Sequence, residues 1–103
     1  MQINNAYYSK KKIRTLIEKD AVIIESNALE SAKKDFGWDY KKICEALLKI
    51  PSRCCYNRKP RFNNPEIWVD YYRAENIMGE NIYTHFYVEN DKLVIDSFKE
   101  LYR

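Results

Sequence analysis

The spacing of the apolar residues changes at Pro51, and this change limits the class of fold that the chain can adopt. Before Pro51, apolar residues recur at the three- and four-residue spacing of helices, as Ile43, Leu47 and Leu48 do. After Pro51, the pattern changes to one that predicts consecutive strands. A helical first half followed by strands predicts an α+β fold, in which three N-terminal helices pack on a mainly antiparallel, twisted sheet.

Capping and turn residues set the expected bounds of the elements. Helices are expected after Ser9 to about Lys19, from Asn27 to Phe36 and from Tyr40 to Lys49, and strands over 21–25, 53–59, 67–73, 82–89 and 92–99. Asn27 and Glu30 have the spacing of a capping box, which places the start of the second helix. Pro60 and Pro65 are expected to bound a loop between two strands. The 103 residues are expected to form one domain, 1–103, with a flexible arm at 1–8.

One segment of the second half, residues 58–73, combines positive charge with aromatic rings. It reads RKPRFNNPEIWVDYYR and holds four cationic and four aromatic residues, in a chain whose net charge is +3. Cations hold phosphates and rings stack on bases, so the segment favours a nucleic-acid surface, with a solvated charged face as the alternative. The expected phosphate contacts are Arg58, Lys59 and Arg61. Tyr71 and Phe62 are expected either to stack on bases or to pack in the core.

Cysteine and histidine usage bears on compartment and metal binding. The three cysteines are Cys44, Cys54 and Cys55, an odd number with two adjacent, which indicates a reducing compartment and hence the cytoplasm. The only histidine, His85, forms no known zinc spacing with the cysteines, so neither a metal nor a cofactor is expected. Neither a membrane span nor a signal peptide is expected from the apolar pattern.

The lysine, arginine and tyrosine residues of the expected strands suit one reaction that needs no metal. RNA carries its own nucleophile, the 2′-hydroxyl group, beside each phosphodiester. A protein that aligns this group must move two protons and stabilise negative charge at phosphorus. Lysine and arginine supply the charge, and tyrosine or lysine can shuttle protons. His85 is either a further proton shuttle beside the RNA or an exposed histidine on a strand.

Three short motifs lie near the end of the chain: IWVDYYR at 67–73, GENIY at 79–83 and SFKE at 97–100. Together with the order of helices and strand before them, they resemble the MqsR family, the motility quorum-sensing regulator toxins. The resemblance implies a RelE-like fold and a ribosome-independent mRNA endonuclease, the toxin of a type II toxin–antitoxin system. It also implies a partner, an antitoxin that binds zinc and carries a helix-turn-helix DNA-binding domain.

The resemblance implies roles for single residues. Tyr83, which follows Gly79, matches the family's catalytic tyrosine, and Lys99 matches the lysine of the SFKE motif. Arg73 matches a family arginine and is expected either to contact phosphate or to pair with Asp70.

Other matched positions carry structural expectations or departures. Trp68 and Tyr72 match family residues and are expected to pack in the core. Where the family has a glutamine this chain has Val69, and where it has a lysine the alignment gives Asn57. Arg58 and Lys59 follow at once, so a small shift can deliver a cation to the same place, and Lys59 is expected to be a third catalytic residue. These departures leave open a catalytically weak module that binds RNA or a protein.

The last two strands carry a geometric prediction. With a two-residue turn at Asn90 and Asp91, a regular hairpin would place Tyr83 opposite Phe98. Tyr83 and Lys99 would then point to opposite faces of the sheet. A shared site requires an irregularity between Asn90 and Ser97, either a β-bulge at the extra residue near Asp96 or a three-residue turn. In a regular strand, His85 would share a face with Tyr83 and Tyr87.

Overall fold

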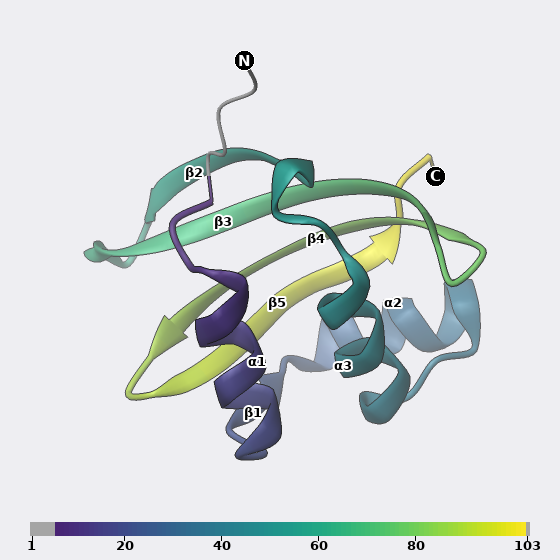
Figure 1. Cartoon of the computed structure of the whole chain (residues 1–103), viewed down its shortest axis with the longest axis horizontal. Helices are drawn as coiled ribbons and strands as arrows, with labels where there is room; N and C mark the ends of the chain where they lie inside the picture. The colour runs from purple at the N-terminus through teal and green to yellow at the C-terminus, as the bar shows by residue number, and fades with distance from the viewer. Residues whose placement is uncertain (1–5, 103) are drawn as a thin grey trace.

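The computed structural model describes residues 6–102, which form an α+β fold with three α-helices on one side of a five-stranded sheet (Figure 1). The elements in chain order are α1 Lys10–Glu18, β1 Val22–Ile24, α2 Ser26–Phe36, α3 Tyr40–Lys49, the 3₁₀ turn η1 Ser52–Cys54, β2 Cys55–Arg61, β3 Asn64–Ile77, β4 Glu80–Glu89 and β5 Lys92–Glu100. The sheet has the order β1-β5-β4-β3-β2. β1 pairs with β5 in parallel, and the other neighbours are antiparallel.

The order of elements differs in one respect from three helices followed by a sheet. Strand β1 separates α1 from α2 and joins the far edge of the sheet beside β5. The short β-branched segment Val22–Ile24 therefore returns the chain to the sheet before α2 begins. No helix within residues 6–102 is long and apolar enough to cross a membrane.

Side-chain caps explain where α1 and α3 begin, whereas the cap expected for α2 does not form. Ser9 accepts a hydrogen bond from the Lys12 backbone N–H at its side chain, and Asp39 caps α3 in the same way, as expected. The capping box expected at Asn27 is wrong, because α2 begins at Ser26 after Glu25 and has no side-chain cap. The Asn27 side chain instead donates to the backbone carbonyl of a residue on β5.

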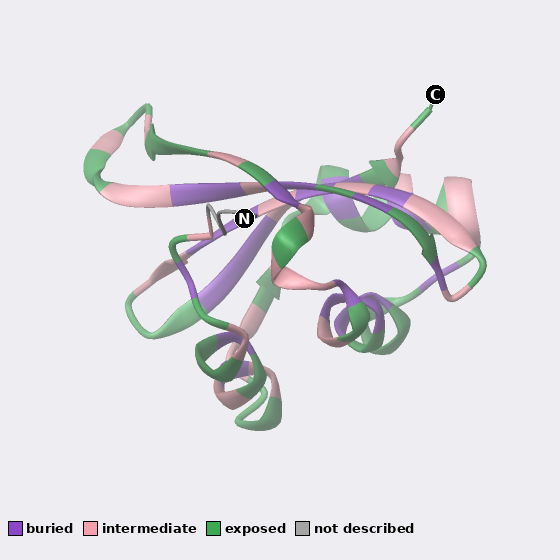
Figure 2. Ribbon diagram, turned by 45° about the horizontal axis from the view of Figure 1, so that its top comes forward, coloured by how far each residue is buried: buried purple, intermediate pink, exposed green. Residues whose placement is uncertain are grey.

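The core lies between the helices and one face of the sheet (Figure 2). The sheet contributes large buried rings, with Tyr72, Phe86 and Phe98 at 2% exposure or less. The helices contribute small and aliphatic residues, namely Ile13, Leu16, Ala28, Ala32, Ile43, Ala46 and Leu47. The expected core position of Tyr72 is confirmed, and Trp68 is half-buried.

The end of the expected flexible arm packs against β3. Residues 1–5 lie outside the described residues, but Tyr8 is buried and its hydroxyl donates to the Trp68 carbonyl at 2.6 Å. The backbone N–H groups of Tyr7 and Tyr8 donate to the Asp70 carboxylate at 2.9–3.0 Å. A buried carboxylate needs such donors, so residues 6–8 are bound to the sheet and do not form a loose arm.

The hairpin of β2 and β3 is longer than expected. Pro60 lies inside β2 and Pro65 inside β3, so the two prolines do not bound a loop. β2 is an edge strand of the sheet. An edge strand can accommodate a proline, because the missing N–H need not pair with a further strand. β3 has 14 residues and continues to Ile77, four residues beyond the expected end at residue 73.

Candidate active site and nucleic-acid interface

The hairpin of β4 and β5 contains the predicted irregularity. Asn90 and Asp91 form the turn with φ of 52° and 58°, and Glu89 pairs with Lys92. The register then shifts by one residue, because Phe86 pairs with Ile95 whereas the preceding His85 pairs with Ser97. The predicted irregularity between Asn90 and Ser97 is therefore confirmed, and it is a bulge at Asp96 and not a three-residue turn.

This bulge places Tyr83 directly opposite Lys99. Both side chains lie on the face of the sheet that the helices do not cover, because Ile82, Thr84 and Phe98 point into the core. We call this surface the open face and define it by the side chains that lie on it, namely Lys59, Arg61, Tyr71, Arg73, Tyr83, His85 and Lys99. The ammonium nitrogen of Lys99 lies 5.4 Å from the ring centroid of Tyr83.

A hollow of about 590 Å³ lies at this pair. It is lined by Arg73, Glu75, Tyr83, Lys99, Leu101 and Tyr102. Arg73 pairs with Tyr83 across β3 and β4, and its guanidinium lies 4.0 Å from the ring centroid of Tyr56. Two cations therefore flank one phenol, which is an arrangement that can hold a phosphate and stabilise added negative charge.

The Tyr83 phenol is held in its protonated form. Burial raises its pKa well above the ordinary value, and a hydrogen bond with the Tyr56 side chain raises it further. Arg73 opposes this shift without reversing it. Tyr83 is therefore a proton or hydrogen-bond donor at neutral pH and is a poor base.

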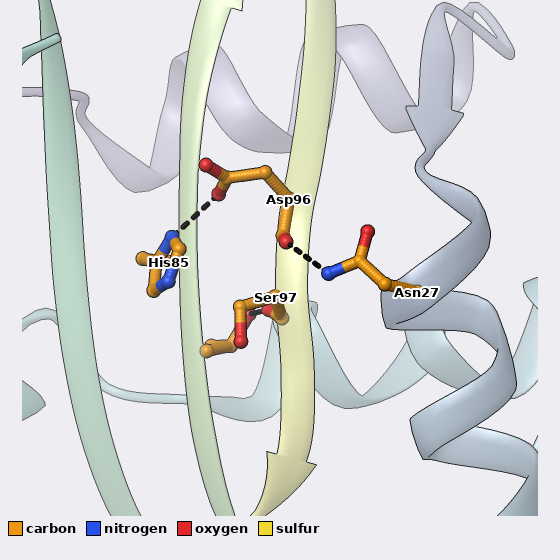
Figure 3. Close-up of polar contacts among 5 residues, drawn as sticks. Asn27, His85, Asp96 and Ser97 are labelled. Atoms are coloured by element: carbon orange, nitrogen blue, oxygen red, sulfur yellow. Dashed lines mark hydrogen bonds and ion pairs between the residues drawn. The ribbon is translucent and has the colours of Figure 1, made fainter. Parts of the chain in front are cut away.

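His85 is paired with a carboxylate. Its Nδ1 lies 2.5 Å from Oδ1 of Asp96, the bulged residue, and the two side chains are 20% and 25% exposed (Figure 3). The bulge is fixed on both sides: the Asn27 side-chain amide donates to the Asp96 carbonyl at 3.1 Å, and the Thr84 hydroxyl donates to the Ser97 carbonyl at 2.6 Å.

Aromatic rings contact His85 from the neighbouring strand β3 and from its own strand β4. The His85 ring centroid lies 4.8 Å from that of Tyr71 on β3 and 5.6 Å from that of Tyr83 on its own strand. Tyr71 in turn meets Tyr56 at 6.3 Å. The open face therefore carries a continuous strip of rings from β2 to β4, which is suited to stacking with bases.

A second hollow, of about 440 Å³, lies beside Tyr71, toward the tip of the β2–β3 hairpin. It is lined by Lys59, Pro60, Arg61, Phe62, Asn63, Val69, Tyr71 and Asp96. Lys59 lies over Tyr71 at 5.5 Å, and Arg61 lies over Tyr87 at 4.4 Å and 3.6 Å from Glu89. Phe62 is 97% exposed at the tip of the hairpin, so it does not pack in the core.

Arg58 is separated from the other expected phosphate contacts. It pairs with Asp70, and its guanidinium lies 5.5 Å from the Trp68 ring, whereas Lys59 pairs with Val69. Side chains alternate along a strand, so Arg58 lies on the opposite face from Lys59. Arg73 points to the open face and Asp70 away from it, so the pairing of these two residues is excluded.

Val69 and Asn57, the two positions that depart from the family pattern, lie on neighbouring strands and contact other residues of the sheet. Val69 is buried at 4% exposure opposite Lys59. Asn57 pairs with Tyr71, and its side-chain oxygen accepts from the Arg58 N–H at 2.8 Å. Lys59 lines the second hollow and not the one that contains Tyr83 and Lys99.

Sequence reasoning missed three residues of this surface. Asp96 was singled out only as the extra residue of the hairpin, and Tyr56 was not singled out at all. Glu75, which accepts from the Tyr102 hydroxyl at 2.7 Å, follows Arg73 by two residues on β3 and therefore shares its face. The alternation of side chains along a strand would have predicted the position of Glu75 if the expected strand had extended beyond residue 73. Across residues 6–102, no group of three His, Cys, Asp or Glu side chains is arranged to hold a metal ion.

The fold and this surface define a class: a small α+β protein with a strip of cations, aromatic rings and one His–Asp pair on an uncovered sheet face. The family described as "Motility quorum-sensing regulator, toxin of MqsA" matches residues 5–100, and the chain belongs to this MqsR toxin family. It is accordingly a toxin of a toxin–antitoxin system, for which an antitoxin partner is implied. No curated protein matches the chain.

Proposed function

We propose that this toxin is an mRNA endoribonuclease, or mRNA interferase, that cleaves single-stranded RNA without a metal ion and without the ribosome. The observation that carries the proposal is the pairing of Tyr83 with Lys99 beside Arg73 in one hollow of the open face. Family membership supports the same activity, and the RelE-like classification of the fold is part of the proposal.

The proposed reaction uses the 2′-hydroxyl group of the RNA as nucleophile. Its oxygen attacks the adjacent phosphorus, the bond from phosphorus to the 5′-oxygen breaks, and the products carry a 2′,3′-cyclic phosphate and a 5′-hydroxyl group. Lys99 and Arg73 stabilise the added negative charge at phosphorus. Tyr83, whose raised pKa keeps it protonated, donates the proton to the leaving 5′-oxygen.

The remaining cations of the open face hold the chain of the RNA. Lys59 and Arg61 line the second hollow, toward the tip of the β2–β3 hairpin, whereas Lys99 lines the first. They bind phosphates on one side of the scissile bond while Tyr71 stacks on a splayed base. In this role Lys59 positions the substrate and does not touch the reacting phosphate.

The proposed partner is a cognate antitoxin that binds zinc and carries a helix-turn-helix domain. Family membership supports an antitoxin, and the finer description follows the resemblance of the chain to MqsR toxins. The proposal is tested by co-expression, in which the antitoxin is recovered bound to the toxin and relieves its toxicity.

A second candidate is a catalytically weak module that binds RNA or a protein. The observation that favours it is the neutral character of Val69 and Asn57, since Val69 is buried and Asn57 bonds to its own strand. Under this alternative the basic, aromatic face binds its partner and the phosphodiester bond stays intact.

The experiment that separates the two is cleavage of a mixed-sequence single-stranded RNA in EDTA. Wild type is compared with Lys99→Ala and with Lys92→Ala, which removes an exposed lysine at the turn end of the same strand. Cleavage by wild type and Lys92→Ala, but not by Lys99→Ala, supports the endoribonuclease. Binding of RNA without cleavage by any of the three supports the module.

A further inference from the structure

The proposed reaction leaves one role unassigned, the group that takes the proton from the 2′-hydroxyl. Tyr83 cannot fill it, because burial and the Tyr56 hydrogen bond raise its pKa and keep it protonated. Lysine and arginine are cationic at neutral pH and act on negative charge. Histidine is the side chain that most readily changes its charge near neutral pH, and the open face contains one.

The orientation of that histidine is fixed by its neighbour. The Asp96 carboxylate accepts from Nδ1 of His85 at 2.5 Å, so the neutral ring carries its proton on Nδ1 and a free electron pair on Nε2. A base oriented by a carboxylate through its second nitrogen is the arrangement that nucleophile activation requires. The carboxylate also stabilises the imidazolium that forms when Nε2 takes a proton.

The position of the pair links the two hollows. The His85 ring contacts Tyr83, which lines the first hollow, and Asp96 lines the second. An RNA strand that crosses from one hollow to the other therefore passes over His85. The side chain is 20% exposed, which leaves it accessible to that strand.

We propose that His85 is the general base of the reaction and that Asp96 is the residue that positions it. Nε2 accepts the proton of the 2′-hydroxyl as the oxygen forms its bond to phosphorus, while the bond to the 5′-oxygen breaks and that oxygen takes a proton from Tyr83. Transfer of one proton back through water restores both side chains. This inference rests on the endoribonuclease proposed above and assigns to Asp96 a role that the family resemblance does not give it.

The groups that face the pair set the expected pH dependence. They include Tyr71 from β3, Tyr83 and Tyr87 from β4 itself and Ser97 beside Asp96 on β5. From β2, Lys59 lies across the Tyr71 ring, and Arg61 lines the same hollow as Asp96. Burial, and after it the charge of Asp96, raises the pKa of Tyr71, so this phenol adds no negative charge beside His85 near neutrality. The acidic limb of the pH–rate profile is therefore expected to follow the His85–Asp96 pair.

The test is a single-turnover pH–rate profile for cleavage of one single-stranded RNA in EDTA. Wild type is compared with His85→Gln, His85→Ala with and without added imidazole, and Asp96→Asn. The matched control is Asp91→Asn, which removes the same charge at the 92%-exposed tip of the same hairpin. RNA binding and thermal unfolding of each variant show that it is folded.

The inference predicts a loss of about 10²–10⁴-fold in rate for His85→Gln, with disappearance of the acidic limb. It also predicts recovery of His85→Ala by imidazole and a smaller loss with a shifted acidic limb for Asp96→Asn. Asp91→Asn keeps the wild-type profile. An unchanged rate and profile for folded His85→Gln overturns the inference alone, whereas absence of cleavage by wild type overturns the proposed function together with it.

Discussion

Tyr83 lies directly opposite Lys99 although a regular hairpin with the same two-residue turn would pair it with Phe98. The difference is one residue, Asp96, which is bulged out of β5. In the regular register Asp96 would also lie opposite His85, and in the bulged strand its carboxylate still contacts that ring. The bulge therefore creates the pairing of Tyr83 with Lys99 and retains the contact of His85 with Asp96.

Deletion of Asp96 separates the register of the hairpin from the effect of the Asp96 carboxylate. The shortened hairpin has a regular register that still pairs Tyr83 with Lys99, because one residue is removed between the turn and Lys99. We expect the deletion variant to fold and to bind RNA, with the reduced rate and altered pH profile of Asp96→Asn. The rate and pH profile are measured in the cleavage assay described above, and full activity with the wild-type profile would show that the carboxylate plays no part.

Two neighbouring cations are expected to differ in their effect on RNA binding. Lys59→Ala removes a cation of the open face, so affinity falls and the slope of log K against log salt becomes shallower by about 0.7. Arg58→Ala removes a cation from the opposite face and leaves that slope unchanged. Titration of a fluorescent single-stranded RNA at several salt concentrations measures both slopes, and equal changes in the two variants would argue against the open face as the RNA surface.

Asp70 is expected to make stability depend on pH. Burial raises the pKa of its carboxyl, although the Tyr7 and Tyr8 N–H groups and Arg58 act in the other direction. A raised pKa means that the folded protein holds this proton more tightly than the unfolded chain. The stabilisation from Asp70 is thus complete below the ordinary value of 3.8 and is lost as pH rises through the raised pKa.

Urea unfolding of wild type and Asp70→Asn at several pH values tests this sign. The free energy of unfolding of wild type relative to the variant should decrease as pH rises from about 3 to about 7, because the variant has no carboxyl to titrate. If the free energy of unfolding of wild type relative to the variant increased with pH, the three hydrogen bonds from the Tyr7 and Tyr8 N–H groups would outweigh the cost of burying the carboxylate.

Lys10 is expected to stabilise the fold without affecting RNA binding. Its ammonium group donates to the backbone carbonyls of Leu47, Leu48 and Ile50 at 2.6–3.0 Å, which ties α1 to the end of α3. Lys10→Met should lower the free energy of unfolding by about 1–2 kcal/mol, a value that allows for partial solvent screening. The exposed neighbour Lys11→Met is the control, and equal losses in both variants would rule out the carbonyl contacts as the cause.

The sequence predicted most of the elements and the pairing at the bulge, because periodicity, caps and residue counts are local information. It did not predict that Tyr7 and Tyr8 bind Asp70, since that contact joins segments more than 60 residues apart. Alternation places Arg58 and Lys59 on opposite faces, but which of the two points to the open face depends on an irregularity between Cys55 and Asn57 that carries no clear signal. Residue counting in a regular hairpin places Asp96 opposite His85, but it does not show that Asp96 keeps this contact when it is bulged out of the register.

The central claim is that the open face cleaves RNA through the RNA's own 2′-hydroxyl group. The most direct test uses two RNAs that differ only by a single 2′-deoxy nucleotide on the 5′ side of a mapped cleavage position. The account predicts that wild type binds both RNAs equally in EDTA and that cleavage at that position is abolished in the deoxy RNA. Cleavage that persists at the deoxy position would contradict the account, because the nucleophile would then have to be water or a protein group.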